Sequence, residues 1–365
     1  MRDHAVTMKI LIVKLSAIGD VIHTLPALTA LRRHYPNAQI DWLVESAAAD
    51  LVQGHAALNR VLIWRRREFV RLLKAGRLPS AVGLFSSLLL QLRDTRYDLI
   101  IDFQALLKSS LWIFLTRGRR KAGFGQGMAH SENSHLFLNE RIPAVSMEMH
   151  ALDRGLRLLQ ALGIQDSQVL YDLPLGDEEE RAAEQILVEN GIRSDQPFVA
   201  INPVAKWPTK LWAAERFRKL AECLLKKGFQ VAFTGSKGDR PVIDEIACTL
   251  DSPVVRLDGR TSLKVLAAVY RSASVVVTTD TGPMHLAAAV RTPVVALFGP
   301  TAPWRTGPYG EGHVVLRASV SCSPCFSKSC KTVELEPMAC MNGITVEQVV
   351  EAVARLAAEK KSRAG

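Results

Sequence analysis

The first residues able to do chemistry lie near the amino terminus, in the segment Ser16-Ala17-Ile18-Gly19-Asp20. This segment joins an apolar stretch to a helical pattern and holds one glycine, so it lacks the G-x-G-x-x-G loop that cradles a dinucleotide pyrophosphate. Asp20 falls at the start of the predicted helix, where a carboxylate either caps free backbone N–H groups or accepts a proton from a substrate hydroxyl. Both roles stay open on the sequence alone.

Further polar residues follow apolar stretches in the second half of the chain. Asn202 begins a loop that carries Lys206, Lys210 and Trp212. The two lysines supply cations for a diphosphate, although a solvated loop with one buried tryptophan explains them equally well. Gly235 lies in a short turn of a kind that follows many strands, which is a weaker signal.

The most elaborate of these segments is Asp280-Thr281-Gly282-Pro283-Met284-His285, which precedes an alanine-rich helical pattern. Gly282 permits close backbone approach, and the free amides at a helix start favour an anion. Asp280 is either a cap or an acceptor for those amides or for sugar hydroxyls. The segment predicts an anion-binding site.

The positive charge of the chain is concentrated in one segment. The whole chain carries a net charge of +10, and residues 60–121 alone hold fourteen Lys or Arg against four acidic residues, which is the same excess. Candidate anion-binding residues here are Arg65, Arg66, Arg67 and Arg120. Such a segment attracts an anionic partner (nucleic acid, an acidic membrane or a phosphorylated substrate), unless it is only a solvated face.

Four of the six cysteines lie close together, in the pattern Cys322-x2-Cys325-x4-Cys330-x9-Cys340. Four thiols at this spacing could ligate a structural zinc or iron ion, while free thiols or one local disulfide are equally consistent with it. Six cysteines in 365 residues are too few for a disulfide scaffold.

Two parallel sheets are needed to position these loops. Apolar β-branched runs alternate with helical patterns, which is typical of crossover-connected parallel strands, so the fold class is α/β with two doubly wound units. In such units ligands bind at the carboxyl ends of the strands, here in a cleft between the domains. Strands are predicted at 9–14, 39–44, 99–102, 198–202, 230–234, 274–278 and 293–298, and helices at 21–34, 286–290 and 345–360.

The length fits two domains. An acidic run at 177–180, Gly191 and a turn pattern at 194–197 separate the two sets of strands. We expect an N-terminal domain over 1–175, a C-terminal domain over 176–344, and a closing helix and tail over 345–365.

Composition excludes several protein classes. With 48% apolar and 22% charged residues, the chain is neither disordered nor a collagen nor a coiled coil. No stretch reaches the ~18 apolar residues of a membrane span, and the apolar run at 10–13 is too brief for a secretory signal. We therefore expect a cytoplasmic protein.

Several of these motifs together carry a resemblance to a known family. They are Ile12-Val13-Lys14-Leu15-Ser16-Ala17-Ile18-Gly19-Asp20-Val21-Ile22-His23-Thr24-Leu25-Pro26-Ala27-Leu28, Lys210 with Trp212, Asp280 to His285, and Phe298-Gly299-Pro300-Thr301. In this combination the chain resembles the bacterial ADP-heptose:lipopolysaccharide heptosyltransferases of glycosyltransferase family 9, over nearly its whole length from Met8. The N-terminal loop is more similar to the heptosyltransferase I branch, which adds the first heptose to 3-deoxy-octulosonic acid on lipid A.

The resemblance implies a GT-B fold, with the acceptor on the N-terminal domain and ADP-L-glycero-D-manno-heptose on the C-terminal one. It implies that Asp20 is the catalytic base, that Lys210 binds the donor phosphates, and that Asp280, Thr281 and Gly282 line the donor site. We add Asn202, Gly235 and His285 to the donor site because they lie in the same group of loops.

The expected reaction inverts the anomeric centre and needs no metal cofactor, because the chain has no D-x-D pair to hold a nucleotide sugar through a divalent ion. Lipid A at an anionic membrane face suits the basic segment, which predicts peripheral contact with the inner face of the inner membrane. Nucleic acid is disfavoured because no binding motif accompanies the arginines.

Two alternatives remain. One is a GT-B transferase for another nucleotide sugar or another acceptor, such as the second heptose or a protein. The other is a non-catalytic nucleotide-binding or polyanion-binding protein.

Overall fold

The computed structural model describes residues 7–128, 132–166, 168–248, 250, 254–332 and 335–364. Contacts divide the chain into two compact units between Pro174 and Leu175, one residue before the expected boundary. The closing helix α13 (Val346–Ala364) packs on α7 (Ala214–Lys226) and buries Val349 and Val353, so it is part of the second unit and not a separate segment.

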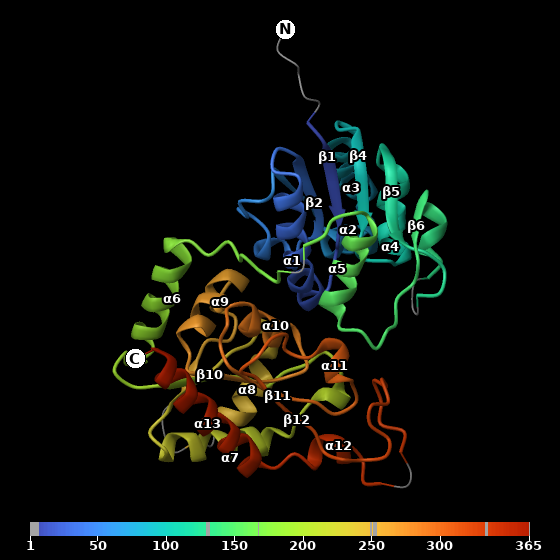
Figure 1. Ribbon diagram of the computed structural model, residues 1–365. Coiled ribbons are helices and arrows are strands. Elements are labelled where there is room, and N and C mark those ends of the chain that lie inside the picture. The colour runs from blue at the N-terminus through green and yellow to red at the C-terminus, as the bar shows by residue number, and fades with distance from the viewer. Residues whose placement is uncertain are drawn as a thin grey trace. The chain divides into compact units, whose positions relative to one another are not determined.

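The first unit is built on six parallel strands in the order β3-β2-β1-β4-β5-β6 (Figure 1). The strands are β1 (Lys9–Val13), β2 (Gln39–Glu45), β3 (Arg60–Trp64), β4 (Tyr97–Asp102), β5 (Gly118–Phe124) and β6 (Glu140–Ile142). The central strands β1 and β4 are nearly all buried, as expected for apolar strands covered on both faces. The strand order reverses between β1 and β4, which is where doubly wound sheets bind ligands.

Helices cover both faces of this sheet. They are α1 (Ile18–His34), α2 (Arg66–Lys74), α3 (Leu78–Arg93), α4 (Leu107–Leu115) and α5 (Ala151–Ala161), with short 3-10 helices η1 (Ala49–Leu51) and η2 (Ser134–Phe137). Right-handed crossovers place α2, α3 and α4 on the face opposite α1. In agreement, α1 packs on α5, whereas Phe85 of α3 stacks on Trp112 of α4 with ring centroids 5.0 Å apart.

The second unit has the same kind of sheet, in the order β12-β11-β10-β7-β8-β9. Its strands are β7 (Phe198–Asn202), β8 (Gln230–Phe233), β9 (Val255–Arg256), β10 (Val275–Thr279), β11 (Val294–Leu297) and β12 (Val314–Leu316). Its other helices are α6 (Asp177–Glu189), α8 (Arg240–Ala247), α9 (Leu263–Ser272), α10 (Gly282–Ala289), α11 (Pro303–Thr306) and α12 (Ala339–Asn342), with η3 (Pro208–Lys210) and η4 (Lys237–Asp239). Trp212 and Phe217 lie in its core, with ring centroids 5.0 Å apart.

The predicted α/β class is confirmed, and every predicted strand is present. Five strands were not predicted: β3, β5, β6, β9 and β12. Strand β5 reads Gly-Arg-Arg-Lys-Ala-Gly-Phe and is half-exposed over its first residues, so it lacks the apolar run that marks a buried strand. The helix predicted at 286–290 begins four residues earlier, at Gly282. Among the helices of the described ranges, none is long and apolar enough to cross a membrane.

A buried carboxylate shapes the loop that follows β4. Asp102 Oδ1 accepts hydrogen bonds from the backbone N–H of Gln104 (3.0 Å) and of Ala105 (3.1 Å), and Asp102 Oδ2 accepts one from Ser109 Oγ (3.3 Å). These bonds hold Ala105 in a left-handed conformation, with φ of 53°, that a non-glycine residue seldom adopts. Burial raises the pKa of Asp102 to about 6, although the hydrogen bonds and the nearby Lys14 ammonium oppose the shift.

This raised pKa predicts a pH-dependent stability. The folded state holds the Asp102 proton more tightly than the unfolded state does between pH ~4 and ~6, so the stabilisation is complete below pH ~4 and is lost as the pH rises through ~6. Relative to Asp102→Asn, the free energy of unfolding of the wild-type chain should fall by on the order of 3 kcal/mol between pH ~4 and pH ~7, which is the energy that corresponds to a pKa raised from 3.8 to about 6. Urea unfolding at several pH values measures the difference.

Asp177→Asn, at an exposed position on α6, is the control for the loss of one carboxylate. A difference between wild type and Asp102→Asn that stays constant from pH 4 to pH 7 would contradict the assignment.

Candidate active site

Asp20 lies in the first turn of α1, immediately beyond the carboxyl end of β1. The backbone N–H of Ala17 donates to Asp20 Oδ2 (2.9 Å), and Thr24 Oγ1 donates to the Asp20 carbonyl oxygen (2.8 Å). The loop before the helix is fixed by Gln104, whose Oε1 accepts from the N–H groups of Leu15 and Ser16, both at 3.0 Å. Asp20 is thus a cap of its own helix, which holds its carboxylate in one place.

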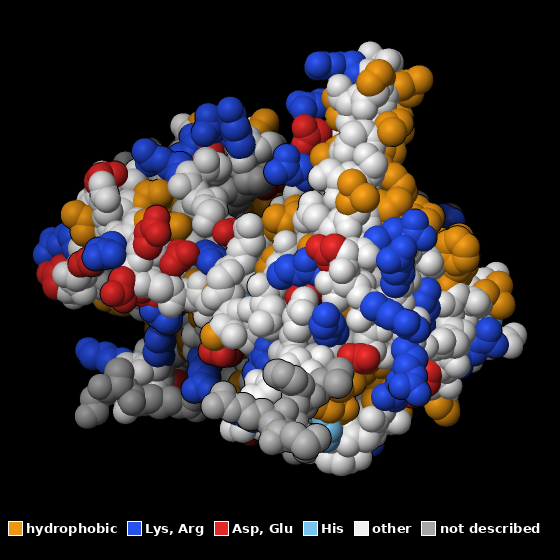
Figure 2. All heavy atoms as spheres, turned by 90° about the horizontal axis from the view of Figure 1, so that it is seen from above, with side chains coloured by type: hydrophobic (Ala, Val, Ile, Leu, Met, Phe, Trp, Pro, Cys, Tyr) orange, Lys and Arg blue, Asp and Glu red, His pale blue; other side chains and the backbone are white. Residues whose placement is uncertain are grey.

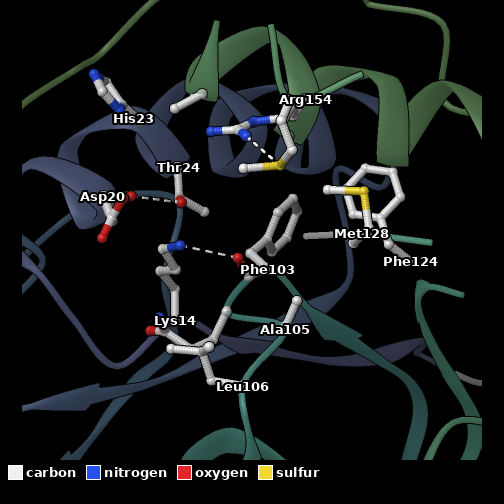
Figure 3. A pocket seen from close by; sticks show the side chains of 14 residues that line it. Lys14, Asp20, His23, Thr24, Phe103, Ala105, Leu106, Phe124, Met128 and Arg154 are labelled. Carbon is white, nitrogen blue, oxygen red and sulfur yellow. Dashed lines mark hydrogen bonds between the residues drawn. The ribbon is translucent and has the colours of Figure 1, made fainter. Parts of the chain in front are cut away.

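The carboxylate of Asp20 borders a pocket of about 400 Å³ in the first unit (Figure 3). Lys14, Thr24, Phe103 and Arg154 also line it. Lys14 Nζ donates to the Phe103 carbonyl oxygen (2.9 Å), and Arg154 Nη1 lies 2.9 Å from the sulfur of Met147. The pocket therefore combines one carboxylate with two cationic side chains.

Lys14 is the electrostatic centre of this pocket. Burial lowers the pKa of its ammonium, while the negative charges of Asp20 and Asp102 act in the opposite direction and Arg154 adds to the lowering. A buried cation in such surroundings favours an anionic ligand, because a further negative charge would offset the cost of burying the Lys14 ammonium.

The four arginines of the basic segment do not meet at one place. Arg65, Arg66 and Arg67 are exposed at the start of α2, just after the carboxyl end of β3. Arg120 lies near the start of β5, which three strands separate from β3, and its guanidinium pairs with Glu140 through two contacts of 2.8 Å. The first three are thus placed at the ligand-binding edge of the sheet, while Arg120 is paired within the protein.

In the second unit, Lys210 and Asp280 lie at the carboxyl ends of neighbouring central strands. Lys210 Nζ lies 2.6 Å from Asp280 Oδ2 and 4.7 Å from the centroid of the Trp207 ring. Thr301 Oγ1 donates to the same carboxylate oxygen (2.6 Å). Asp280 is only 7% exposed, so this ion pair is well shielded from water.

The remaining predicted donor residues surround this ion pair or support its loops. Thr281 is the N-cap of α10, and Gly282 begins it, so the free amides of this helix lie beside Asp280. His285 is buried on α10. Asn202 Nδ2 donates to the Thr234 carbonyl oxygen (2.9 Å), which ties the ends of β7 and β8 together. A Cβ at Gly235 would lie 3.0 Å from Ile243 Cδ1 and 3.2 Å from Asp239 Cβ, so a larger residue in this turn would have to displace both side chains slightly.

The cysteine cluster lines one pocket of about 540 Å³ in the second unit. Cys340 is buried, which raises the pKa of its thiol, and the Met338 N–H donates to Cys330 Sγ (3.4 Å), which lowers the pKa of that thiol. Within the described ranges, no group of three or more His, Cys, Asp or Glu is arranged to hold a metal ion. All four thiols thus line this one pocket.

Sequence reasoning missed Lys14, Arg154 and Thr301 as site residues. Lys14 ends an apolar run, and its position directly after a central strand was an available signal. Arg154 reaches the pocket from α5, far along the chain, and nothing local to it indicates a site. Thr301 was part of a recognised turn, but its bond to Asp280 depends on the pairing of β10 with β11.

The chain is similar to known proteins in both sequence and fold. The family model of glycosyltransferase family 9 (heptosyltransferase) matches residues 85–335. Lipopolysaccharide heptosyltransferase 1 of Pseudomonas aeruginosa is 34% identical over 331 residues, which cover 88% of this chain and 87% of the relative.

Solved structures are similar across the whole chain. The structure of the Escherichia coli heptosyltransferase WaaC with ADP has a TM-score of 0.74 at 26% identity, covering 96% of this chain and 100% of the other. The same enzyme with ADP-2-deoxy-2-fluoro heptose has a TM-score of 0.70 at 26% identity, covering 95% and 99%. These neighbours confirm the GT-B fold class.

The family model covers most of the chain, and the curated relative exceeds 30% identity over nearly all of it. The chain belongs to glycosyltransferase family 9 and is a glycosyltransferase similar to heptosyltransferase I.

Proposed function

We propose that this chain transfers heptose from ADP-L-glycero-D-manno-heptose to 3-deoxy-octulosonic acid on lipid A, in the assembly of the lipopolysaccharide inner core. The names of its relatives and the ADP-bound and ADP-sugar-bound neighbours support this donor and this pathway. The observation that carries the acceptor assignment is the pocket where Asp20 lies among Lys14 and Arg154. An acidic sugar brings the negative charge that these cations need, and a hydroxyl for the carboxylate.

In the proposed reaction Asp20 takes the proton of the acceptor hydroxyl as its oxygen attacks the anomeric carbon of the heptose. The bond from that carbon to the β-phosphate oxygen breaks, and ADP leaves with the electron pair. Attack and departure on opposite sides of the carbon invert its configuration in one step. Asp20 has a fixed orientation, since its Oδ2 is bound to the Ala17 N–H.

The second unit is proposed to stabilise the leaving ADP. The Lys210 ammonium and the free amides at the start of α10 are the groups placed to meet developing phosphate charge. Because Lys210 is paired with Asp280 in this structure, its ammonium would bond both the Asp280 carboxylate and the phosphates once the donor is bound. Asp280 could then accept hydrogen bonds from heptose hydroxyls.

The location proposed for this reaction is cytoplasmic, at the inner face of the inner membrane, where the lipid-linked acceptor would be met. The exposed Arg65, Arg66 and Arg67 support contact with its anionic surface.

The direct test is product formation. The chain is incubated with ADP-heptose and deacylated lipopolysaccharide core, and ADP release and the mass of the product are followed. Turnover with a different nucleotide sugar only would make the chain another GT-B transferase. ADP binding without any turnover would make it a nucleotide-binding protein.

Asp20→Asn should lower kcat by about 10²–10⁴-fold, because loss of a general base usually costs that much. Steady-state kinetics of ADP release measure the loss, and calorimetry should find the affinity for ADP unchanged. Asp177→Asn, also in the first turn of a helix, is the matched control. A folded Asp20→Asn variant that retains most of its rate would rule out Asp20 as the base.

Lys210→Ala should weaken ADP binding about ten- to a hundredfold, since a hydrogen bond to a charged group contributes roughly 1.5–3 kcal/mol. Isothermal titration with ADP measures the change, and thermal unfolding of the apo variant checks its fold. Lys206→Ala removes an exposed lysine of the same loop and should have little effect. If Lys206→Ala weakens binding and Lys210→Ala does not, the diphosphate is held by Lys206.

We also propose that the reaction needs no divalent cation and that any zinc or iron at Cys322, Cys325, Cys330 and Cys340 has a structural role only. Turnover in excess EDTA should equal turnover with added Mg²⁺. Metal analysis of protein purified without chelator, compared with Cys325→Ser/Cys330→Ser, decides whether the cluster holds an ion. Activity that EDTA abolishes and Mg²⁺ restores would contradict the first part. Four alkylatable thiols in metal-free, active protein would show that the cluster holds no ion, whereas a folded variant that loses both its ion and its activity would contradict a purely structural role.

A further inference from the structure

The α2–α3 hairpin extends from the first unit with little core of its own. Helix α2 has no buried residue, and every residue from 73 to 80, which includes the turn between the helices, is exposed. Two antiparallel helices of 9 and 16 residues normally bury one face each. Here a large part of both apolar faces meets solvent.

The exposed apolar residues of the hairpin are large. Val70, Leu73, Leu78, Val82 and Leu90 are 38%, 42%, 59%, 64% and 70% exposed. In the described part of the first unit, all other large apolar side chains with comparable exposure lie on α4 and η2, on the same face of the sheet: Leu107, Leu111, Phe114 and Leu136. Exposed apolar side chains gathered in one region indicate an interaction surface.

The base of the hairpin, in contrast, is firmly packed. Trp64 lies 5.1 Å from Phe69 and 5.0 Å from Trp112, and Phe85 stacks on Trp112 at 5.0 Å, all between ring centroids. This aromatic cluster fixes both helices where they leave the sheet. The exposed outer part is therefore held out by a rigid base.

Positive charge surrounds these apolar residues. Residues 65–93 contain seven Lys or Arg and one acidic residue, Glu68, which gives a net charge of +6. Figure 2 shows blue Lys and Arg side chains beside orange hydrophobic ones on the protruding part of the surface at the top of the view. Apolar residues flanked by Lys and Arg are typical of helices that lie in the interface of an anionic bilayer.

We propose that the α2–α3 hairpin is a membrane anchor that lies in the headgroup region of an anionic bilayer. Leu73, Leu78 and Val82 enter the boundary with the acyl chains, and Arg65, Arg66 and Arg67 contact lipid phosphates. The proposal deepens the proposed function, on which it rests for the lipid-linked acceptor. A membrane contact made by charge alone would be weakened by high salt, whereas a contact that includes inserted apolar side chains would persist at high salt.

A bilayer suits this surface better than a protein partner does. A protein partner would need a largely acidic groove to match seven cations, whereas an anionic leaflet offers both the charge and an apolar layer beneath it. The 16 residues of α3 are too few to span a bilayer, so the hairpin lies in the interface.

Anchoring would also orient the site. Residue Arg65 follows the carboxyl end of β3, and parallel pairing of β3, β2 and β1 places that end at the same sheet edge as the loop before Asp20. Lipid headgroups at the hairpin would then lie along the edge that carries the candidate acceptor pocket.

The test uses the full chain and vesicles of phosphatidylglycerol and phosphatidylethanolamine, with cosedimentation as readout. Leu73→Gln/Leu78→Gln/Val82→Gln should lower the partition coefficient at least about tenfold, since three apolar side chains leave the interface. Wild type should remain partly bound in 0.5 M salt, whereas this variant should be released. Neutralising Arg65, Arg66 and Arg67 to Gln should lower binding at low salt, by about fivefold for each charge.

Val188→Gln is the matched control, because Val188 is 64% exposed on α6 of the second unit. The apolar triple variant should keep its turnover on deacylated acceptor in solution and show a raised KM for acceptor embedded in vesicles. Glutamine is a good helix former, so replacement of exposed residues should leave the hairpin folded.

Three results would overturn the anchor: no binding of wild type to anionic vesicles, unchanged binding of the apolar triple variant, or an equal loss in Val188→Gln. A dimer that the triple variant dissociates, with vesicle binding unchanged, would instead identify the surface as a self-association face. Vesicle binding needs no turnover, so a chain that binds vesicles but releases no ADP contradicts the proposed function and leaves the anchor standing.

Discussion

Parallel strand pairing brings residues from distant parts of the sequence to one sheet edge in each unit. In the first unit Val13 lies opposite Leu43 on one side and Asp102 on the other, so the loops after β1 and β4 begin side by side. The Lys14 ammonium can then bond the Phe103 carbonyl, and Gln104 can hold the loop before Asp20. Each of these contacts joins residues almost ninety positions apart, and a shift of one residue in register would remove them.

Parallel strand pairing likewise brings distant residues together in the second unit, where they form an ion pair. Pairing of β10 with β7 and β11 brings Asp280 beside the loops that carry Lys210 and Thr301. A shielded carboxylate is costly unless it is paired, and here one ammonium and one hydroxyl satisfy it. Such a pair keeps the Lys210 ammonium in position without leaving it as an uncompensated charge.

The sequence allowed the fold class and the central strands to be predicted because buried parallel strands are continuous apolar runs. Strand β5 is half-exposed over its first residues and carries basic side chains, and the edge strand β12 has only three residues, so no apolar run or periodicity distinguished them. Asp20, Lys210 and Asp280 could be put forward as candidate site residues because each lies in a distinctive loop after a strand. The partners Lys14, Arg154 and Thr301 could not, since their roles depend on tertiary contacts that no local pattern records.

The two roles considered for Asp20 on sequence alone, helix cap and general base, are physically compatible. A carboxylate has two oxygens, and in the described structure the cap bond from Ala17 engages Oδ2. This hydrogen bond restricts the rotation of the Asp20 side chain. A general base must lose that rotational freedom in any case when it is aligned with the acceptor hydroxyl. The hydrogen bond that stabilises the start of α1 therefore also fixes the orientation of the Asp20 carboxylate. Helix capping and the proposed proton transfer both require that one fixed orientation.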